Sequence, residues 1–247
     1  MKQWRWRWQK FLVLAIAIFI VLSGQITALS LPEYTSNLPA SRVHPLPKSL
    51  ANWQNRKGHY FRQIEQSPLG YLVWSRFPIT VYIQRPNKIT DSAASKRFQQ
   101  WVAAVENAIA EWNVYLPLQV ISDSEAADIA IWRSQPRREA KLNPDTGLYD
   151  IPRAVTAETS YKFYLKQNPA VIAHKMTIQI SPNYVGTSLM ATIRHELGHA
   201  LGIWGHSLNK EDALYFSQVS DPSPISARDI NTLKKIYQQP TKLGWQI

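Results

Sequence analysis

Residues 195–207 constrain the fold of this chain more than any other stretch, because they read HELGHALGIWGHS and hold three of its six histidines. His195 and His199 are four residues apart, so on a helix both imidazoles lie on one face and can bind one metal ion. Glu196 lies about a third of a turn from His195, where its carboxylate can take a proton without coordinating the metal. We therefore predict a helix that carries two metal ligands and a general base.

A third ligand is expected beyond the end of this helix. Gly202 can adopt a left-handed conformation, which ends the helix and turns the chain. That turn would bring His206 back to the same ion. Three neutral imidazoles leave one position open for water, which is typical of a catalytic Zn²⁺ site and not of a closed structural one. The alternative is that these are surface histidines on an ordinary amphipathic helix.

The extended motif, closed by Ser207, resembles the HExxHxxGxxH pattern of the metzincin clan of zinc endopeptidases, and within it the matrixins. The resemblance implies a methionine in a tight turn below the metal, eight residues past the third histidine. Here that position is Leu214. The turn residue forms a hydrophobic floor and does not bind the metal, and Leu for Met nearly conserves volume.

Two further stretches resemble the matrixins and extend the similarity to about residues 74–238. A Trp leads by five residues to Pro117-Leu118, and Ala127-Asp128-Ile129 follows as a strand. After the metal motif, residues 225–237 resemble the closing helix of the family. The resemblance implies an α+β fold. We expect a small twisted mixed sheet, covered by a long first helix and the zinc-binding helix, with a C-terminal helix after the Leu214 loop.

The first 28 residues are typical of an export signal. Four basic residues precede a continuous apolar run at 11–22, and Ala28 offers a cleavage site before Leu29. The run is shorter than the roughly 20 residues that span a bilayer. An uncleaved anchor formed by residues 11–31 is the alternative. We therefore expect an exported protein, secreted or periplasmic, or one held at a membrane by its N-terminus.

Composition limits how the protein can be stabilised and which partners it can bind. The chain has no cysteine, so disulfides cannot stabilise it and no prosegment cysteine can block the zinc. The formal net charge is +11; without the four basic residues of the signal it is 11 − 4 = +7. Such a charge suits acidic surfaces, or is simply a soluble basic surface. No nucleic-acid module is recognisable, and we expect a monomer whose partner is a protein or peptide substrate.

Three parts are expected along the chain: the signal or anchor at 1–28, an irregular Pro-rich arm at 29–70, and a catalytic domain at 71–247. Trp53 and Tyr60-Phe61 could dock the arm. Hydrophobic periodicity predicts the elements of the domain. They are strands at 79–83, 118–121, 128–132, 155–165 and 176–180, and helices from Ser92 to Trp112, 187–203 and 226–238.

One of the paired strands at 155–165 and 176–180 is expected to run beside the active-site cleft and pair with extended substrate. Residues 136–152 are predicted as a loop, in which Asp145 or Asp150 could bind Ca²⁺ or simply form turns. His174 is interpreted as a strand histidine and not as a second metal site.

These patterns predict a zinc-dependent endopeptidase with one catalytic Zn²⁺. His195, His199 and His206 are its expected ligands, and Glu196 its expected base. One alternative is a non-catalytic, zinc-stabilised binding protein on the same scaffold, which the replacement of Met by Leu214 favours and the intact Glu196 opposes. Another is a membrane-tethered factor that acts through its basic face.

Overall fold

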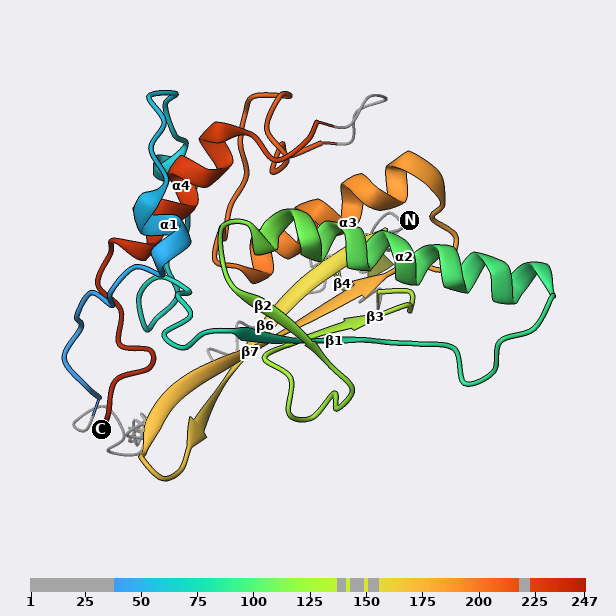
Figure 1. The fold of residues 1–247 in the computed structure, drawn as a ribbon. Helices are drawn as coiled ribbons and strands as arrows, with labels where there is room; N and C mark the ends of the chain where they lie inside the picture. Colours follow the sequence, from blue (N-terminus) through green and yellow to red (C-terminus); the bar gives the residue numbers. More distant parts are fainter. Residues whose placement is uncertain (1–37, 137–140, 143–148, 151–155, 218–222) are drawn as a thin grey trace, which may run out of the picture. The chain divides into compact units, whose positions relative to one another are not determined.

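The computed structural model describes residues 38–136, 141–142, 149–150, 156–217 and 223–247. Over these residues the chain forms a five-stranded mixed sheet, a two-stranded sheet and four α-helices (Figure 1). The long helices α2 (Ala93–Asn113) and α3 (Gly186–Ala200) lie on one face of the larger sheet. Helix α3 contacts two of its strands, β6 (Ala157–Lys166) and β7 (Val171–Ile180). This confirms the expected α+β architecture.

The larger sheet has the order β2-β1-β3-β7-β6. Its strands are β1 (Ile79–Ile83), β2 (Leu118–Ile121), β3 (Ile129–Trp132), β6 (Ala157–Lys166) and β7 (Val171–Ile180). Strands β2, β1, β3 and β7 run parallel to one another, whereas β6 and β7 form the expected antiparallel pair. In β1 and β7 the residues that face the core alternate with less buried ones, as the period of a strand requires. The strand at the edge beside β7 is β6.

Helix α2 (Ala93–Asn113) begins where its sequence offers a cap, because the Ser92 hydroxyl accepts a hydrogen bond from the backbone N–H of Ser95. The predicted apolar stripe lies against the core, with Trp101 and Trp112 essentially fully buried. Helix α4 (Ala227–Tyr237) begins with a capping box between Ser226 and Asp229.

Helix α3 (Gly186–Ala200) carries the first part of the histidine motif. It ends three residues before the predicted limit at Ile203, because the chain turns at Gly202, where φ is +120°. A Cβ at this position would lie 2.4 Å from the carbonyl oxygen of Leu72. Only glycine fits both this conformation and this close approach.

The N-terminal arm packs onto the domain from residue 38 onward. It contains α1 (Lys48–Asn52) and a 3₁₀ turn, η2 (Phe61–Gln63). The indole N–H of Trp53 donates to Asn231, and Tyr60 is almost fully buried. These two residues are among the three proposed from the sequence to dock the arm.

Several sequence-based expectations fall on residues that the structure does not describe, among them the signal or anchor at 1–28. Within the predicted loop at 136–152, two short strands, β4 (Lys141–Leu142) and β5 (Tyr149–Asp150), pair antiparallel. Asp145 lies outside the described residues, and only the backbone of Asp150 is described. Within the described part of the chain, no helix has both the length and the apolar character to cross a membrane.

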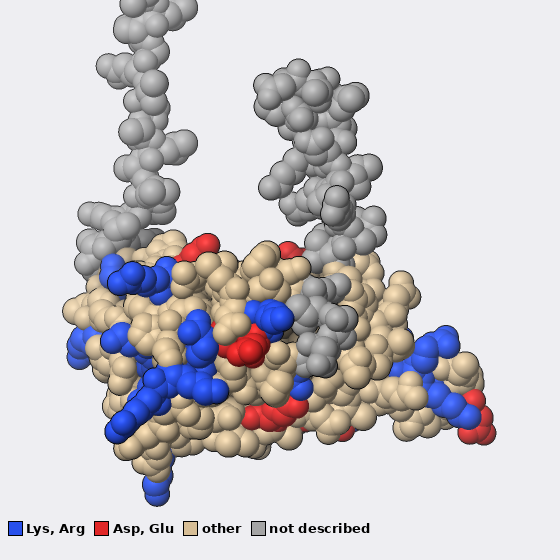
Figure 2. All heavy atoms as spheres, turned by 90° about the horizontal axis from the view of Figure 1, so that it is seen from above, with Lys and Arg blue, Asp and Glu red and all other residues tan. Residues whose placement is uncertain are grey.

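Basic side chains are unevenly distributed on the face seen from above in Figure 2. Lys and Arg gather mostly on the side where α1 and α4 lie in Figure 1. Helix α4 contributes Arg228, Lys234 and Lys235 to the chain's basic residues. One of these ties the arm down, because the Lys234 ammonium donates to the carbonyl oxygens of Ala51 and Trp53.

Candidate metal centre

The three predicted ligands meet in space. His195 and His199 project from α3, and His206 returns to them from the loop after Gly202. One ligand nitrogen of each ring lies within 4.8 Å of the other two. In the described part of the chain this is the one group of His, Asp or Glu side chains close enough to hold a metal ion.

Hydrogen bonds on the far side of two rings determine which nitrogen faces the centre. Nδ1 of His195 lies 2.9 Å from the carbonyl oxygen of Ala213, and Nδ1 of His199 lies 2.7 Å from that of Ile203. A carbonyl oxygen can only accept, so each Nδ1 carries the proton and each Nε2 presents a lone pair.

The Nε2 atoms of His195 and His199 are 3.0 Å apart. With both protons held on Nδ1, neither Nε2 has a hydrogen to donate to the other, and two facing lone pairs repel. A cation between them removes the repulsion. Two nitrogens bound about 2.0–2.1 Å from one tetrahedral Zn²⁺ would lie about 3.3 Å apart. The donor set and its spacing therefore fit a metal ion such as zinc.

Burial keeps the ligands neutral. It lowers the pKa of His199 to about 4, and burial together with the nearby His199 lowers the pKa of His195 to about 4. His206 is exposed, but partial burial of its ring still lowers its pKa, and the carboxylate of Glu65 opposes this shift. Neutral imidazole is the form that binds a metal, so the rings are ready for it at neutral pH.

Glu196 lies beside the triad but is not part of it. Its side chain is 9% exposed, and its Oε2 accepts a hydrogen bond of 2.6 Å from the hydroxyl of Thr159 on β6. Burial raises the pKa of Glu196, while the neighbouring His195 and the bond from Thr159 oppose that rise. The result is a positioned carboxylate whose affinity for a proton is increased, as a general base requires.

Leu214 forms the floor below the ligands. It is fully buried, and its Cδ2 lies 2.6 Å from where a Cβ on Gly198 would stand. Gly198 belongs to the same helix as the ligands, so the absence of a side chain there lets the Leu214 loop approach α3 closely. The residue at the predicted turn position therefore packs under the metal site.

Two buried carboxylates hold this loop in place. Asp229 on α4 accepts hydrogen bonds from the Tyr60 hydroxyl and from the backbone N–H of Ala213, whose carbonyl oxygen faces His195. Asp212 accepts from the hydroxyl of Ser207 and from the guanidinium of Arg228. The arm, α4 and the loop are thus linked to a metal ligand through one chain of hydrogen bonds.

A partly buried ion pair links α3 to α2 next to His195. The Arg194 guanidinium donates to both carboxylate oxygens of Glu111, at 2.5 and 2.9 Å, and to the carbonyl oxygen of Ser223. The indole N–H of Trp112 donates to the carbonyl oxygen of Arg194. These contacts limit rotation of α3 about its own axis.

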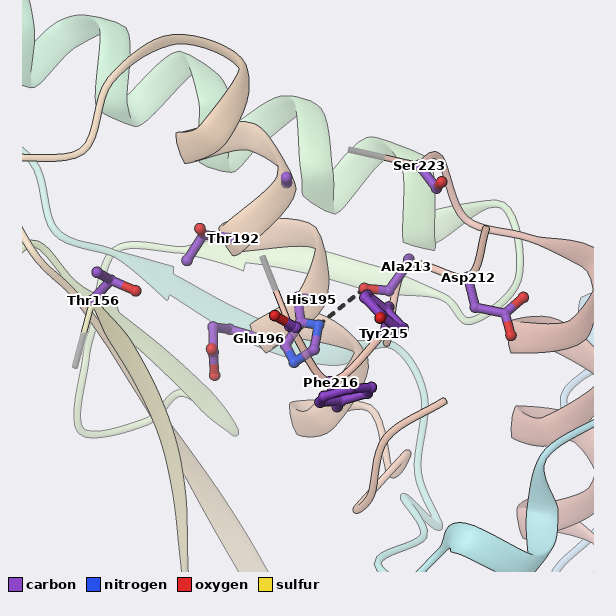
Figure 3. Close-up of a pocket in the computed structure, with 11 residues that line it drawn as sticks. Thr156, Thr192, His195, Glu196, Asp212, Ala213, Tyr215, Phe216 and Ser223 are labelled. Carbon is purple, nitrogen blue, oxygen red and sulfur yellow. Dashed lines mark hydrogen bonds between the residues drawn. The ribbon is translucent and has the colours of Figure 1, made fainter. Parts of the chain in front are cut away.

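Two hollows open on either side of Glu196, which lines both of them. The first lies between α3 and the segment 212–217, and Figure 3 shows His195 and Glu196 on α3 and Ala213, Tyr215 and Phe216 on the facing segment. The second contains His199 and His206. An extended chain that crosses Glu196 would enter both hollows.

The other three histidines are distant from the triad in sequence, and their contacts are with other residues. His174 is buried in β7, as predicted for a strand histidine, and stacks on Trp74 at 3.9 Å between ring centroids. His44 stacks on Trp245 and bonds to the carbonyl oxygen of Leu243. His59 packs edge-on against Phe61 in the arm.

Sequence reasoning missed several residues that build the site, namely Thr159, Asp212 and Asp229. A signal existed for one of them, since Ser226 and Asp229 have the spacing of a capping box. Thr159 and Asp212 carry no such local pattern. Thr159 bonds to Glu196, which is 37 residues away in sequence. Asp212 bonds to Arg228, which is 16 residues away.

Neither a scan against protein-family models nor a search of curated proteins finds a match to this chain. The site is therefore assigned from its own residues and geometry: a histidine triad able to hold one metal ion, with a buried carboxylate beside it.

Proposed function

We propose that this protein is a zinc-dependent endopeptidase similar to the matrixins of the metzincin clan. One observation carries the proposal. Three imidazole nitrogens converge on a point beside Glu196, a buried carboxylate that Thr159 holds out of the ligand set. This division between ligands and base is what a hydrolytic metal site needs.

The motif departs from the pattern of the clan in two places. Three residues lie between Gly202 and His206, one more than the two of HExxHxxGxxH. The loop nevertheless returns His206 to the triad. The second departure is Leu214, which is fully buried as a floor residue should be. With both departures, the three imidazoles still lie together and Glu196 still lines the same hollow as His199 and His206, which supports the proposal.

When bound, Zn²⁺ would lower the pKa of a coordinated water toward about 7 and polarise the scissile carbonyl. Glu196 would accept the proton of that water and then deliver it to the leaving amine. Thr159 keeps the Glu196 carboxylate in one orientation through its hydrogen bond to Oε2. The carbonyls of Ala213 and Ile203 hold His195 and His199 in the tautomer that leaves Nε2 free.

Extended polypeptide is the proposed substrate. Strand β6 lies at the edge of the sheet and carries Thr159, the partner of Glu196. An extended chain can add to such an edge by backbone hydrogen bonding. Its side chains would then alternate between the sheet and the two hollows, and the bond to be cleaved would lie over Glu196.

A Glu196→Ala variant tests the proposal, with metal content measured beside hydrolysis of a mixed peptide library. The variant should bind as much zinc per protein molecule as the parent, because the lost group is the base and not a ligand. Its rate of peptide cleavage should fall by about 10²-fold or more. His206→Ala should lose zinc as well. Glu125→Ala, which removes a carboxylate outside both hollows, should change neither.

Two results would contradict the proposal. Hydrolysis by Glu196→Ala at the parental rate would remove Glu196 from the role of base. A parent that binds zinc but cleaves no peptide in the library would instead favour the non-catalytic, zinc-stabilised binding protein.

A further inference from the structure

The hollow on the His206 side of the metal centre has an acidic residue in its wall. Its volume is about 280 Å³, whereas a water occupies about 30 Å³ of liquid, so it has room for a side chain. Its lining combines the metal centre with one residue of the N-terminal arm: Glu65, Thr159, Glu196, His199, Trp204, Gly205 and His206.

The backbone fixes Glu65 at this place. Its N–H donates to the carbonyl oxygen of Trp204 at 2.9 Å, and the preceding Ile64 forms a β-bridge with Gly205. The arm therefore runs directly beside the loop that carries His206. The exposed Glu65 carboxylate is held at the rim of the hollow by its own main chain, and no neighbouring cation is needed to keep it there.

Among the described residues, no Lys or Arg side chain lies within salt-bridge distance of the Glu65 carboxylate. Within this described part of the chain, the Glu65 carboxylate is therefore open to a cation that enters the hollow from solvent.

The hollow also contains an aromatic ring beside the carboxylate. Trp204 lines the same hollow and is held there by edge-on contacts with Tyr161, at 5.0 Å between ring centroids, and by His199. A carboxylate next to an indole favours an ammonium or guanidinium group, because the first supplies opposite charge and the second a cation–π surface. The hollow on the other side of Glu196 is lined instead by Ala213, Tyr215 and Phe216, together with neutral hydroxyls and Asp212.

We propose that the hollow beside His206 takes a Lys or Arg side chain of the substrate, and that Glu65 determines this preference. The inference rests on the proposed peptidase function and deepens it by naming a class of substrate. The cleaved chain carries a basic residue on one side of the scissile bond only, the side that faces Glu65. The other side of the bond meets the hollow at Tyr215 and Phe216.

The test uses peptides that differ at one position. Each has a single Lys at one of three positions on either side of the central bond, and matched peptides carry Gln or Glu there. The parent should prefer Lys over Gln by about five- to ten-fold in kcat/KM, at positions on one side only, as expected for one exposed ion pair with a cation–π contact. Glu65→Gln should reduce this preference to less than about two-fold.

Reversal and control variants sharpen the result. Glu65→Lys should favour the Glu peptide over the Lys peptide, since the charge at the rim changes sign. Glu125→Gln removes the same charge elsewhere and should keep the parental preference. Zinc content and thermal stability of all three variants should match the parent, because Glu65 and Glu125 are exposed.

Failure of the inference is distinguishable from failure of the proposed function. If peptides are cleaved with equal preference by the parent and by Glu65→Gln, Glu65 does not select the substrate. If no peptide is cleaved, the peptidase proposal fails, and binding of the same labelled peptides to the zinc-loaded protein by fluorescence anisotropy decides the inference. Equal or absent binding of the Lys and Gln peptides would overturn it.

Discussion

At the scale of single residues, the proposed metal centre depends on groups outside the histidine triad. The carbonyl oxygens of Ala213 and Ile203 select the tautomers of His195 and His199, and the Thr159 hydroxyl orients Glu196. Leu214 fills the space below them. Each of these supporting groups is fixed by packing, so the ligands need little rearrangement to bind an ion.

Position 214 should accept another apolar side chain of similar volume, but not a charged one. Leu214→Met should keep activity within a few-fold of the parent, because a thioether of similar volume fits at a cost usually below about 1.5 kcal/mol. Leu214→Lys would bury an unpaired ammonium beside the metal, at a cost of several kcal/mol. Peptide cleavage, zinc content and thermal unfolding should be measured for both. A Lys variant that behaves as the parent would show that this side chain is not buried in solution.

His174 should make stability depend on pH. Burial lowers its pKa to about 3, below the ordinary 6.5, so the unfolded state takes up a proton that the folded state does not. The free energy of unfolding should therefore fall as the pH drops below about 6.5, by about 1.4 kcal/mol per pH unit, until the pH approaches the folded pKa.

His174→Phe tests this linkage, because Phe keeps a ring against Trp74 but cannot titrate. Urea unfolding of both proteins at pH 7, 6 and 5 gives the comparison, since protonation of the metal ligands is common to both. The variant should lose less stability between pH 6 and pH 5 than the parent does. Equal losses would mean that His174 is protonated in the folded state or solvated there.

At the scale of elements, the N-terminal arm and the loop of His206 form one unit. Ile64 and Glu65 bond to Gly205 and Trp204, and Tyr60 reaches the Ala213 loop through Asp229. The arm was predicted from its composition as an irregular segment. Its described part, from residue 38, also contributes buried residues to the core and Glu65 to the wall of the hollow beside His206.

Gly205→Ala should weaken zinc binding through this contact. A Cβ at Gly205 would lie 2.1 Å from the carbonyl oxygen of Gln63, so the arm or the His206 loop must move. We expect a loss of about 10- to 100-fold in zinc affinity, measured by competition with a chromogenic chelator. Gly58→Ala is the control, since its nearest atom would be Arg228 Nη1 at 3.5 Å, an ordinary contact. Unchanged affinity in Gly205→Ala would show that the arm does not position His206.

At the scale of the whole molecule, the metal should act as a cross-link in a protein that has no disulfides. The ligands join α3 to the loop that the arm holds, so an ion that binds only the folded state stabilises both. At a free zinc concentration 100 times the dissociation constant this adds about 2.7 kcal/mol.

Removal of the metal with a chelator should lower Tm by roughly 5–10 °C, and added zinc should restore it in a concentration-dependent way. Calorimetry or circular dichroism can follow the change. Glu196→Ala should keep the zinc-dependent shift, and His206→Ala should lose most of it. A parent whose Tm is indifferent to chelator and zinc would contradict a metal site of this strength.

The sequence alone predicted the main helices and strands of the domain, the three histidines that meet in the triad, and Glu196 beside them. These features follow from local rules: a Ser cap before α2, alternation in β1 and β7, four-residue spacing of His195 and His199, and a glycine at the turn. Each rule involves only neighbours along the chain, so periodicity and spacing are enough to reveal it.

Only the tertiary structure decided which distant groups support these residues. Thr159 meets Glu196, Asp229 meets both Tyr60 and Ala213, and Glu65 lies beside His206. None of these contacts has a periodic or local signature, because each joins elements far apart in sequence. Such side chains meet only when the core has brought their elements together, and packing, not spacing, selects their partners.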